Sequence, residues 1–312
     1  MTEPTIAGWT SVRCARMFVV TSSCVSPLAM KPHSHLMIMA ISRLLDPLVL
    51  CGGPCAYVDG TLTGVERSLV QLCGTLVVTL DGRRVDHLLP GRKGRLLFVY
   101  LVLNRTRDVT SAELVEALWG DGAPEQAEAT LRTLISKVRR AIGTDALGRG
   151  GRYRLSFAPE TRIDLEVATD AIHRAESAAA VSDWHRAWAP AQVALITAGR
   201  DFLPGEESPW IAETRRSLRE LENRALECFA AASLGIGGTE LPIAERASRR
   251  LVEREPFHES GYRLLMETLV AEGNVADALL VYEQLAGILR DELGADPSPA
   301  TKDLHRSLLE LT

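Results

Sequence analysis

The sequence predicts a mainly α-helical protein in which a small α+β module precedes an all-α module. Between residues 70 and 158, short alternating segments flank three segments with helical spacing of apolar residues, whereas nearly every segment after Pro159 has helical spacing. The charge changes at the same place. Residues 70–157 carry 14 Lys and Arg against 9 Asp and Glu, and residues 158–312 carry 16 against 27. The 312 residues suffice for two separate cores.

The first 68 residues form an irregular leader in this interpretation. Five of the six Met residues lie within the first 39 positions, and no helical or strand period persists there. An incorrectly assigned start codon is one explanation of this composition, and a disordered or loosely docked leader is the other. Both alternatives leave the leader outside the functional interpretation.

The six cysteines indicate unpaired thiols in a reducing compartment. Cys51 and Cys55 form the one close pair, and no second pair completes a zinc site, so we expect no metal. The apolar segment from Leu36 to Val58 is interrupted by Arg43 and Asp46, which disfavours a membrane span.

The α+β module begins with a small sheet. Residues 70–80 alternate between apolar and polar, and Asp81-Gly82 predicts a hairpin turn. Helices are expected over residues 92–105, from a cap at Ser111 to Trp119, and from about Glu125 to Ile142, where Gly143 ends the third helix.

The third helix has the pattern most informative about function. Its apolar stripe lies opposite Arg132, Ser136, Arg139 and Arg140, which share one face at positions i, i+4, i+7 and i+8. A helix with one buried and one basic face fits the major groove of DNA. A solvated charged face is the alternative for this helix taken alone.

Two more basic clusters favour DNA binding. Gly150-Gly151 predicts a tight hairpin turn, and its arginines are Arg149, Arg152 and Arg154. At the start of the first helix lie Arg92, Lys93 and Arg95, where helix N-terminal amides can also meet phosphate. Three basic clusters in one small module are harder to explain as plain solvated surface.

The all-α module reads as a series of antiparallel helices. The expected helices are 165–180, 183–198, 209–235, 240–254, 258–272, 275–292 and 299–311. Helix pairs of this length suggest a tetratricopeptide-like repeat array. Trp184, Trp188 and Trp210 are expected in its core, and Glu206-Glu207 in a solvated turn. A pocket between the helices could hold an effector, but no polar constellation within 163–312 identifies one.

Several motifs carry a resemblance to a known family. Pro-Gly-Arg-Lys-Gly-Arg-Leu-Leu (90–97), the segments 109–120 and 129–143, and Gly-Arg-Tyr-Arg-Leu (151–155) resemble the winged-helix DNA-binding domain of response-regulator-type transcription factors. Ile-Asp-Leu (163–165), Pro-Trp (209–210) and the segments 280–285 and 290–299 resemble the bacterial transcriptional activator domain. The order of the two resembles the Streptomyces antibiotic regulatory protein family. We call residues 69–158 the winged-helix module and residues 163–312 the helical module.

The resemblance implies a cytoplasmic transcription activator without cofactor or catalytic residues, whose targets are biosynthetic genes. It implies binding to direct repeats in double-stranded DNA as a homodimer and recruitment of RNA polymerase holoenzyme. The DNA-facing residues it implies on the third helix are Thr130, Arg132, Thr133, Ser136, Lys137, Arg139 and Arg140, with Arg149, Arg152 and Arg154 in the hairpin. The polymerase-facing loop runs from Gly120 to Glu128 and contains Asp121, Glu125 and Glu128. The alternative is a protein-interaction adaptor in which the winged helix is a docking module.

Overall fold

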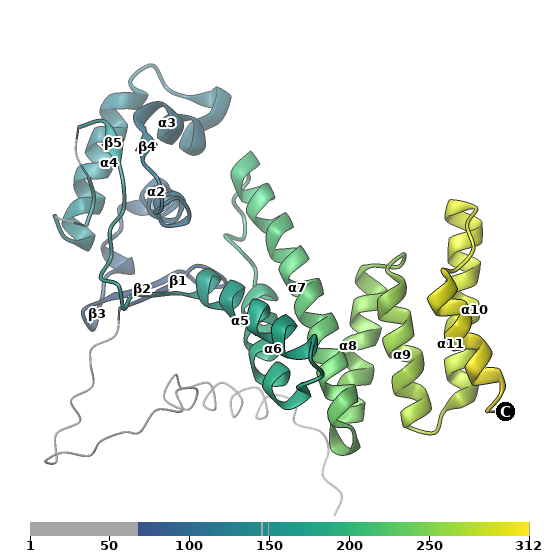
Figure 1. Ribbon diagram of the computed structural model, residues 1–312. Coiled ribbons are helices and arrows are strands. Elements are labelled where there is room, and N and C mark those ends of the chain that lie inside the picture. Colours follow the sequence, from purple (N-terminus) through teal and green to yellow (C-terminus); the bar gives the residue numbers. More distant parts are fainter. Residues whose placement is uncertain (1–67, 145, 149, 312) are drawn as a thin grey trace, which may run out of the picture. The chain divides into compact units, whose positions relative to one another are not determined.

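A computed structural model describes residues 68–144, 146–148 and 150–311 (Figure 1). The expected leader lies outside the described residues except for Ser68, and so does Arg149. The structure has a small sheet and three helices in the winged-helix module and consecutive helices in the helical module. The predicted fold class, a winged helix-turn-helix followed by an all-α repeat domain, is confirmed.

The N-terminal sheet has the strand order β3-β2-β1-β6. Asp81 and Gly82 both have positive φ, 48° and 73°, as the two-residue turn between β2 and β3 requires. The fourth strand lies after residue 158, at the junction with the helical module, pairs in parallel with β1, and was not expected. The strands are β1 Leu69–Gln71, β2 Val77–Leu80, β3 Arg83–Arg84 and β6 Arg162–Ile163.

The three helices of the winged-helix module are α2 Gly91–Leu103, α3 Ser111–Trp119 and α4 Ala127–Ile142. The cap of α3 is Thr110 and not Ser111: the Thr110 hydroxyl accepts from the Glu113 amide, and the Glu113 carboxylate accepts from the Thr110 amide. The short strands β4 Val109–Thr110 and β5 Arg152–Tyr153 pair antiparallel.

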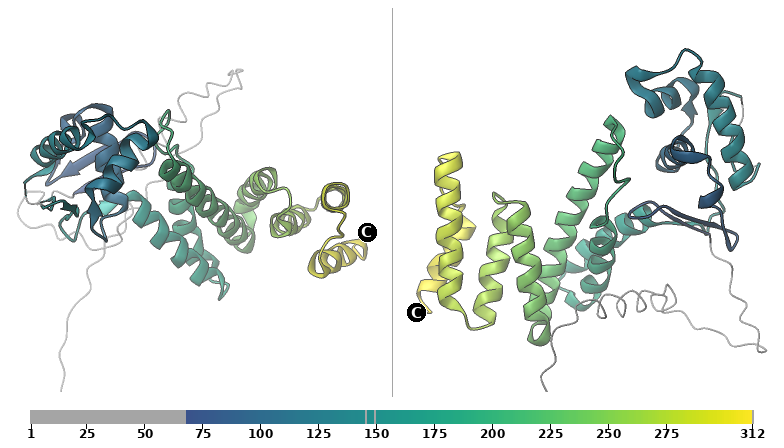
Figure 2. Two further views of the ribbon diagram at one scale, coloured as in Figure 1. Left: turned by 90° about the horizontal axis from the view of Figure 1, so that it is seen from above. Right: turned by 180° about the vertical axis from the view of Figure 1, so that it is seen from behind.

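The helical module consists of antiparallel helices that follow one another along the chain (Figures 1 and 2). Gly235 shows how closely α6 and α7 approach, because a Cβ there would lie 2.4 Å from the Trp184 ring. The helices are α5 Asp164–Ala179, α6 Trp184–Ala198, α7 Pro209–Ile236, α8 Leu241–Arg254, α9 Glu259–Ala271, α10 Val275–Ile288, which continues as a π-helical turn Leu289–Leu293, and α11 Pro299–Leu309.

The first helices of the helical module contact the winged-helix module through a hydrogen bond, an aromatic contact and an ion pair. The Trp210 indole, on α7, donates to the Ala117 carbonyl over 3.0 Å and packs edge-to-face on Tyr100 with ring centroids 5.3 Å apart. Arg105, just after α2, forms a two-pronged ion pair with Glu166 on α5, with N–O distances of 2.5 and 2.6 Å. The buried core of the winged-helix module therefore continues into the helical module.

Candidate nucleic-acid interface

The amphipathic pattern of α4 places its polar residues in solvent. Leu131, Ile135 and Val138 are buried in the core. The opposite face is exposed and carries six of the expected DNA-facing residues: Thr130, Arg132, Thr133, Ser136, Lys137 and Arg140. A helix with these donors on one exposed face can enter a major groove while its apolar face stays in the core.

Lys137 and Arg140 are the exposed cations of this face that are free to bind an anion. Neither forms a hydrogen bond or ion pair with any residue that the structure describes. Together with Leu88 and Pro90 they line a hollow of about 280 Å³. Arg132 is paired with Glu128 at 3.1 Å, but both side chains are 72% exposed, so this pair contributes less than about 1 kcal/mol. Phosphate can displace Glu128 at little cost.

Arg139 has a different environment from its neighbours. The sequence groups it with the DNA-facing residues, but its guanidinium is half-buried and donates to the carbonyls of Leu147 (3.3 Å) and Gly148 (2.5 Å). These carbonyls belong to the first arm of the hairpin that follows α4. In this structure Arg139 therefore positions the hairpin relative to α4.

The hairpin itself is the wing that the sequence predicts. The Gly148 amide donates to the Arg154 carbonyl over 3.0 Å, and Leu147 bridges to Leu155. Arg152 is exposed at β5, whereas the exposed Arg154 donates to the Thr106 carbonyl. Arg152 is thus the described arginine of the wing that is free of such a bond.

The basic cluster at the start of α2 is mostly engaged within the protein. Arg92 is paired with Glu206 at 2.5 Å, so Glu206 is not the purely solvated acid that the sequence suggests. Lys93 donates to the Leu118 carbonyl and lies over the Trp119 ring, 5.7 Å from its centroid. Arg95 is exposed and has no such partner among the described residues.

The loop between α3 and α4 is exposed from Asp121 to Gln126. Asp121 lies in a short 3-10 turn, Gly120–Gly122, and Glu125 has no ion-pair partner in the described ranges. Glu128 lies on the first turn of α4, where a carboxylate is favourable next to the helix N-terminus. Asp121 and Glu125 are available to a basic partner, whereas Glu128 is available only when its exposed pair with Arg132 opens.

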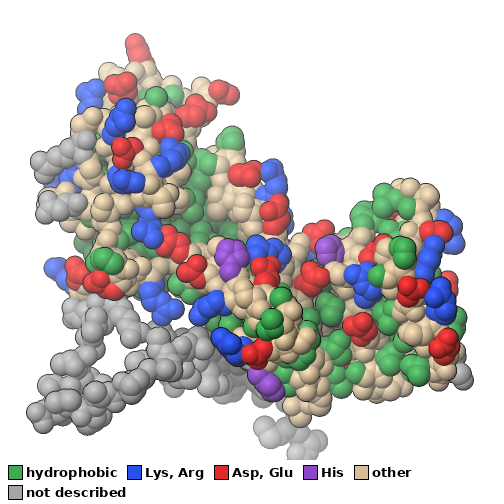
Figure 3. All heavy atoms as spheres, in the orientation of Figure 1, with side chains coloured by type: hydrophobic (Ala, Val, Ile, Leu, Met, Phe, Trp, Pro, Cys, Tyr) green, Lys and Arg blue, Asp and Glu red, His purple; other side chains and the backbone are tan. Residues whose placement is uncertain are grey.

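The face drawn in Figure 3 is not uniformly basic. On it, Lys and Arg side chains alternate with Asp and Glu over both modules. This face therefore offers DNA local cations and no broad positive potential.

Removing Arg139 tests whether it acts through the wing. Arg139→Ala should weaken DNA binding about tenfold, because a hydrogen bond from a charged donor contributes about 1.5–3 kcal/mol. It should also speed amide exchange at Gly148 and Ser156, whose amides donate across the hairpin. The slope of log affinity against log salt should stay at the wild-type value, which fluorescence anisotropy at several salt concentrations measures. A slope smaller by about one would instead identify Arg139 as a phosphate contact.

The described residues offer neither a metal site, nor a membrane-spanning helix, nor a reactive thiol. They contain no cluster of His, Cys, Asp and Glu that could hold a metal ion, and no helix long and apolar enough to cross a membrane. Cys73 and Cys228 are unpaired, and burial raises the pKa of the Cys73 thiol to about 12 and that of Cys228 to about 11. Both thiols therefore stay protonated and unreactive at neutral pH.

Comparisons with known proteins match both modules. Residues 88–152 match the family described as transcriptional regulatory protein, C terminal, and residues 163–309 match the bacterial transcriptional activator domain. Regulatory protein AfsR of Streptomyces coelicolor is 32% identical over 217 residues, which cover 69% of this chain and 22% of AfsR. Regulatory protein DnrI of Streptomyces peucetius is 28% identical over 263 residues, which cover 77% of this chain and 91% of DnrI.

A solved structure has the same fold. Mycobacterium tuberculosis EmbR, determined in complex with a low-affinity phosphopeptide, superposes with a TM-score of 0.69 at 25% identity, over 79% of this chain and 66% of that chain. The present chain thus spans about a fifth of AfsR, two thirds of the EmbR structure and most of DnrI.

Proposed function

The chain belongs to the SARP-type (Streptomyces antibiotic regulatory protein) regulators, and from this premise we propose that it binds promoter DNA and activates transcription. The observation that carries the proposal is the exposed face of α4, on which Lys137 and Arg140 have no hydrogen-bond or ion-pair partner among the described residues. Ser136 lies on the same face and can donate to phosphates or bases. The Thr133 hydroxyl donates to the Ala129 carbonyl over 3.1 Å, so its oxygen can accept from a base. Arg152 in the wing and Arg95 on α2 are further exposed cations of the winged-helix module.

The role is regulatory and not catalytic in this proposal, and the protein acts in the cytoplasm. It binds direct repeats as a homodimer, and the loop from Gly120 to Glu128 contacts RNA polymerase holoenzyme through Asp121, Glu125 and Glu128. The exposure of this loop and the first-turn position of Glu128 support that contact. The family's name refers to antibiotic regulation, which supports a biosynthetic gene cluster as the target.

Selection of genomic fragments by the purified full chain tests the proposal. We expect recovery of a few promoter fragments that contain two copies of one short sequence in direct repeat. Binding to them should weaken steeply between 50 and 200 mM salt, because each phosphate neutralised releases counterions. The control is competition with unrelated DNA, which should bind more weakly by a factor of about 10³ or more.

A second result would support a different role. The helical module is acidic, with 27 Asp and Glu against 16 Lys and Arg over residues 158–312, a charge balance suited to a basic protein partner. If no fragment is enriched over unrelated DNA while the protein forms a stable complex with another protein, the chain is an interaction adaptor and the proposal fails.

A further inference from the structure

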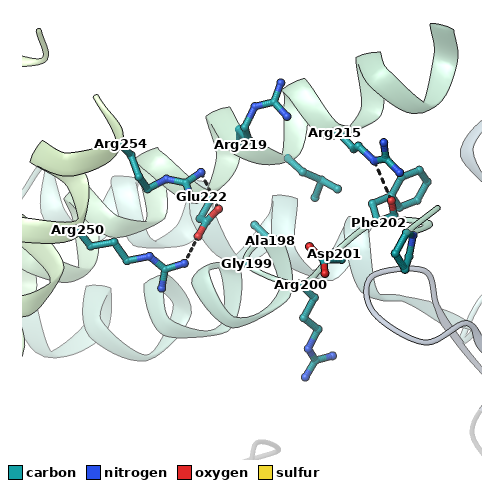
Figure 4. A pocket seen from close by; sticks show the side chains of 12 residues that line it. Ala198, Gly199, Arg200, Asp201, Phe202, Arg215, Arg219, Glu222, Arg250 and Arg254 are labelled. Atoms are coloured by element: carbon teal, nitrogen blue, oxygen red, sulfur yellow. Dashed lines mark hydrogen bonds and ion pairs between the residues drawn. The ribbon is translucent and has the colours of Figure 1, made fainter. Parts of the chain in front are cut away.

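A pocket lined by arginines lies where α6 ends against α7 and α8 (Figure 4). Its volume is about 430 Å³, which is within the range of pockets for small molecules. Five arginines line it: Arg200 after α6, Arg215 and Arg219 on α7, and Arg250 and Arg254 on α8. The sequence did not identify this constellation, because its members come from three separate segments.

The positive charge of the pocket exceeds what its carboxylates can neutralise. Asp201 and Glu222 are the two acids in the lining. Glu222 is only 4% exposed, and its two oxygens accept from Arg250 (2.5 Å) and Arg254 (2.9 Å). Five guanidinium groups of the lining stand against these two carboxylates and against Glu207, which pairs with Arg215 at 3.4 Å from outside the lining, so an excess of two positive charges remains.

Two of the five arginines are free to bind a ligand. Arg215 is committed to the chain itself, since it donates to the carbonyls of Phe202, Leu203 and Glu206. Arg200 and Arg219 are exposed and form no hydrogen bond or ion pair within the part of the chain that the structure describes. Glu222 thus holds Arg250 and Arg254 in place, an arrangement we call the Glu222 clamp, whereas Arg200 and Arg219 are not held by an ion pair in the described residues.

Gly199 keeps the floor of this pocket open. A Cβ at this position would lie 3.0 Å from the Leu195 carbonyl oxygen and 3.3 Å from Oε1 of Glu222. Any larger side chain would therefore press against the carboxylate that Arg250 and Arg254 hold. The glycine lets a ligand approach the clamp.

The distribution of the guanidinium groups indicates the chemical class of the ligand. Figure 4 shows them on different segments: Arg250 and Arg254 point to Glu222, whereas Arg200 and Arg219 extend away from Glu222 in opposite directions. Guanidinium groups suit carboxylates and phosphates alike, but a planar carboxylate presents its acceptors in one plane. A diphosphate group presents oxygens in several directions and carries about three negative charges near neutral pH, from phosphate groups with a second pKa near 6.

We propose that this pocket binds a small multiply phosphorylated anion as an effector. Its position supports such a role, because the Asp201 carbonyl accepts from the Gly74 amide over 2.7 Å and Phe202 bridges to Cys73. The segment that carries Arg200 is thereby hydrogen-bonded to the sheet of the winged-helix module. The proposal concerns the helical module and does not depend on DNA binding by α4.

Isothermal titration calorimetry of the full chain with inorganic pyrophosphate tests the proposal, with adenosine triphosphate and citrate as further probes. We expect saturable binding of pyrophosphate at one site per chain. Arg200→Ala and Arg219→Ala should each weaken it about tenfold or more, since each removes a charged donor. Arg219 is exposed and has no hydrogen-bond or ion-pair partner among the described residues, so Arg219→Ala should not affect folding. The Arg200 charge acts on Asp164, so thermal unfolding must show that Arg200→Ala keeps the fold. The matched control is Arg246→Ala, because Arg246 is exposed on α8 outside the pocket.

Three results would overturn the proposal. Neither pyrophosphate nor adenosine triphosphate binds saturably, or Arg246→Ala weakens binding as much as Arg219→Ala does, which would indicate attraction by diffuse charge. Tighter binding of citrate than of pyrophosphate would show that the site prefers carboxylates and would reject the phosphate assignment.

Discussion

Replacing Lys137 and Arg140 together by alanine should weaken binding to a selected promoter fragment about a hundredfold or more, since each contact to a base or phosphate contributes about 1–3 kcal/mol. Both side chains are exposed on α4 and have no partner among the described residues, so their removal should leave the fold unchanged. If both contact phosphates, the salt slope should fall by about two. Fluorescence anisotropy at four or more salt concentrations measures both quantities.

The matched control removes two positive charges elsewhere. Arg246→Ala with Arg249→Ala changes the net charge equally, but both residues lie on α8 in the helical module. This variant should bind the fragment within about threefold of wild type, because exposed charges more than about 10 Å from DNA are screened at 0.1 M salt. Equal weakening by the two double variants, or binding near the wild-type level by the α4 variant, would remove α4 from the interface.

The structure also separates two residues that sequence reasoning treated together. Arg139 and Arg140 are adjacent in a basic segment, and the spacing of the helix puts both near the polar face. The long arginine side chain, however, can reach either solvent or a neighbouring carbonyl. Arg139 reaches Gly148 because the hairpin returns alongside α4, and this return is a tertiary feature that helical periodicity does not encode.

Regular elements were predictable where local signals agreed. The helices of the helical module begin and end within a few residues of their expected bounds, because apolar periodicity is strong there and Gly, Pro or Asn interrupts it. The expected helix 275–292 is α10 together with its π-helical turn, which ends at Leu293. The first residue of a helix was harder to predict where two neighbouring side chains can both act as the cap. At α3 the capping box forms with Thr110 and not with the neighbouring Ser111. The strand pairing of β6 with β1 joins segments about 90 residues apart, for which the local pattern carries no signal.

Local sequence patterns could likewise predict functional residues that share one helix, but not those that come from distant segments. The cations of α4 lie on one helix and share a period, so their common face could be predicted. The arginines of the pocket lie on the segment after α6, on α7 and on α8, and only the packing of these helices brings them together. Arg92 was predicted to face phosphate, yet in the fold it meets Glu206, a residue from a loop of the other module.

Asp164 should carry the largest single contribution to stability at the junction of the two modules. Its Oδ2 accepts from the amides of Leu72 and Cys73 at 2.9 Å each, and its Oδ1 accepts from the amide of Leu165 at 2.9 Å. The carboxylate thus joins the end of β1 to the first turn of α5. Asp164→Ala leaves these amides without their acceptor and should lower the free energy of unfolding by about 2–4 kcal/mol, because an unsatisfied buried donor costs about 1–3 kcal/mol.

Urea denaturation followed by circular dichroism measures this loss, and Asp164→Asn is the matched variant. Its carbonyl oxygen can keep the bonds from Leu72 and Cys73, while its amide group cannot accept from Leu165. Its loss should therefore be about half that of alanine. A loss below about 0.5 kcal/mol in the alanine variant would show that water or a rearranged backbone satisfies these amides.

The pH dependence of unfolding gives a second comparison between wild type and Asp164→Asn. Burial raises the pKa of the Asp164 carboxyl above its ordinary value near 3.8, although its backbone hydrogen bonds oppose the shift. A group with a raised pKa in the folded state stabilises the fold most below its unfolded pKa, and this contribution is lost as the pH rises through the folded pKa. The asparagine side chain does not titrate. The stability advantage of wild type over Asp164→Asn should therefore shrink as the pH rises from 4 towards neutrality, and an advantage that grows over this range would mean that the hydrogen bonds to the ionised carboxylate outweigh its burial.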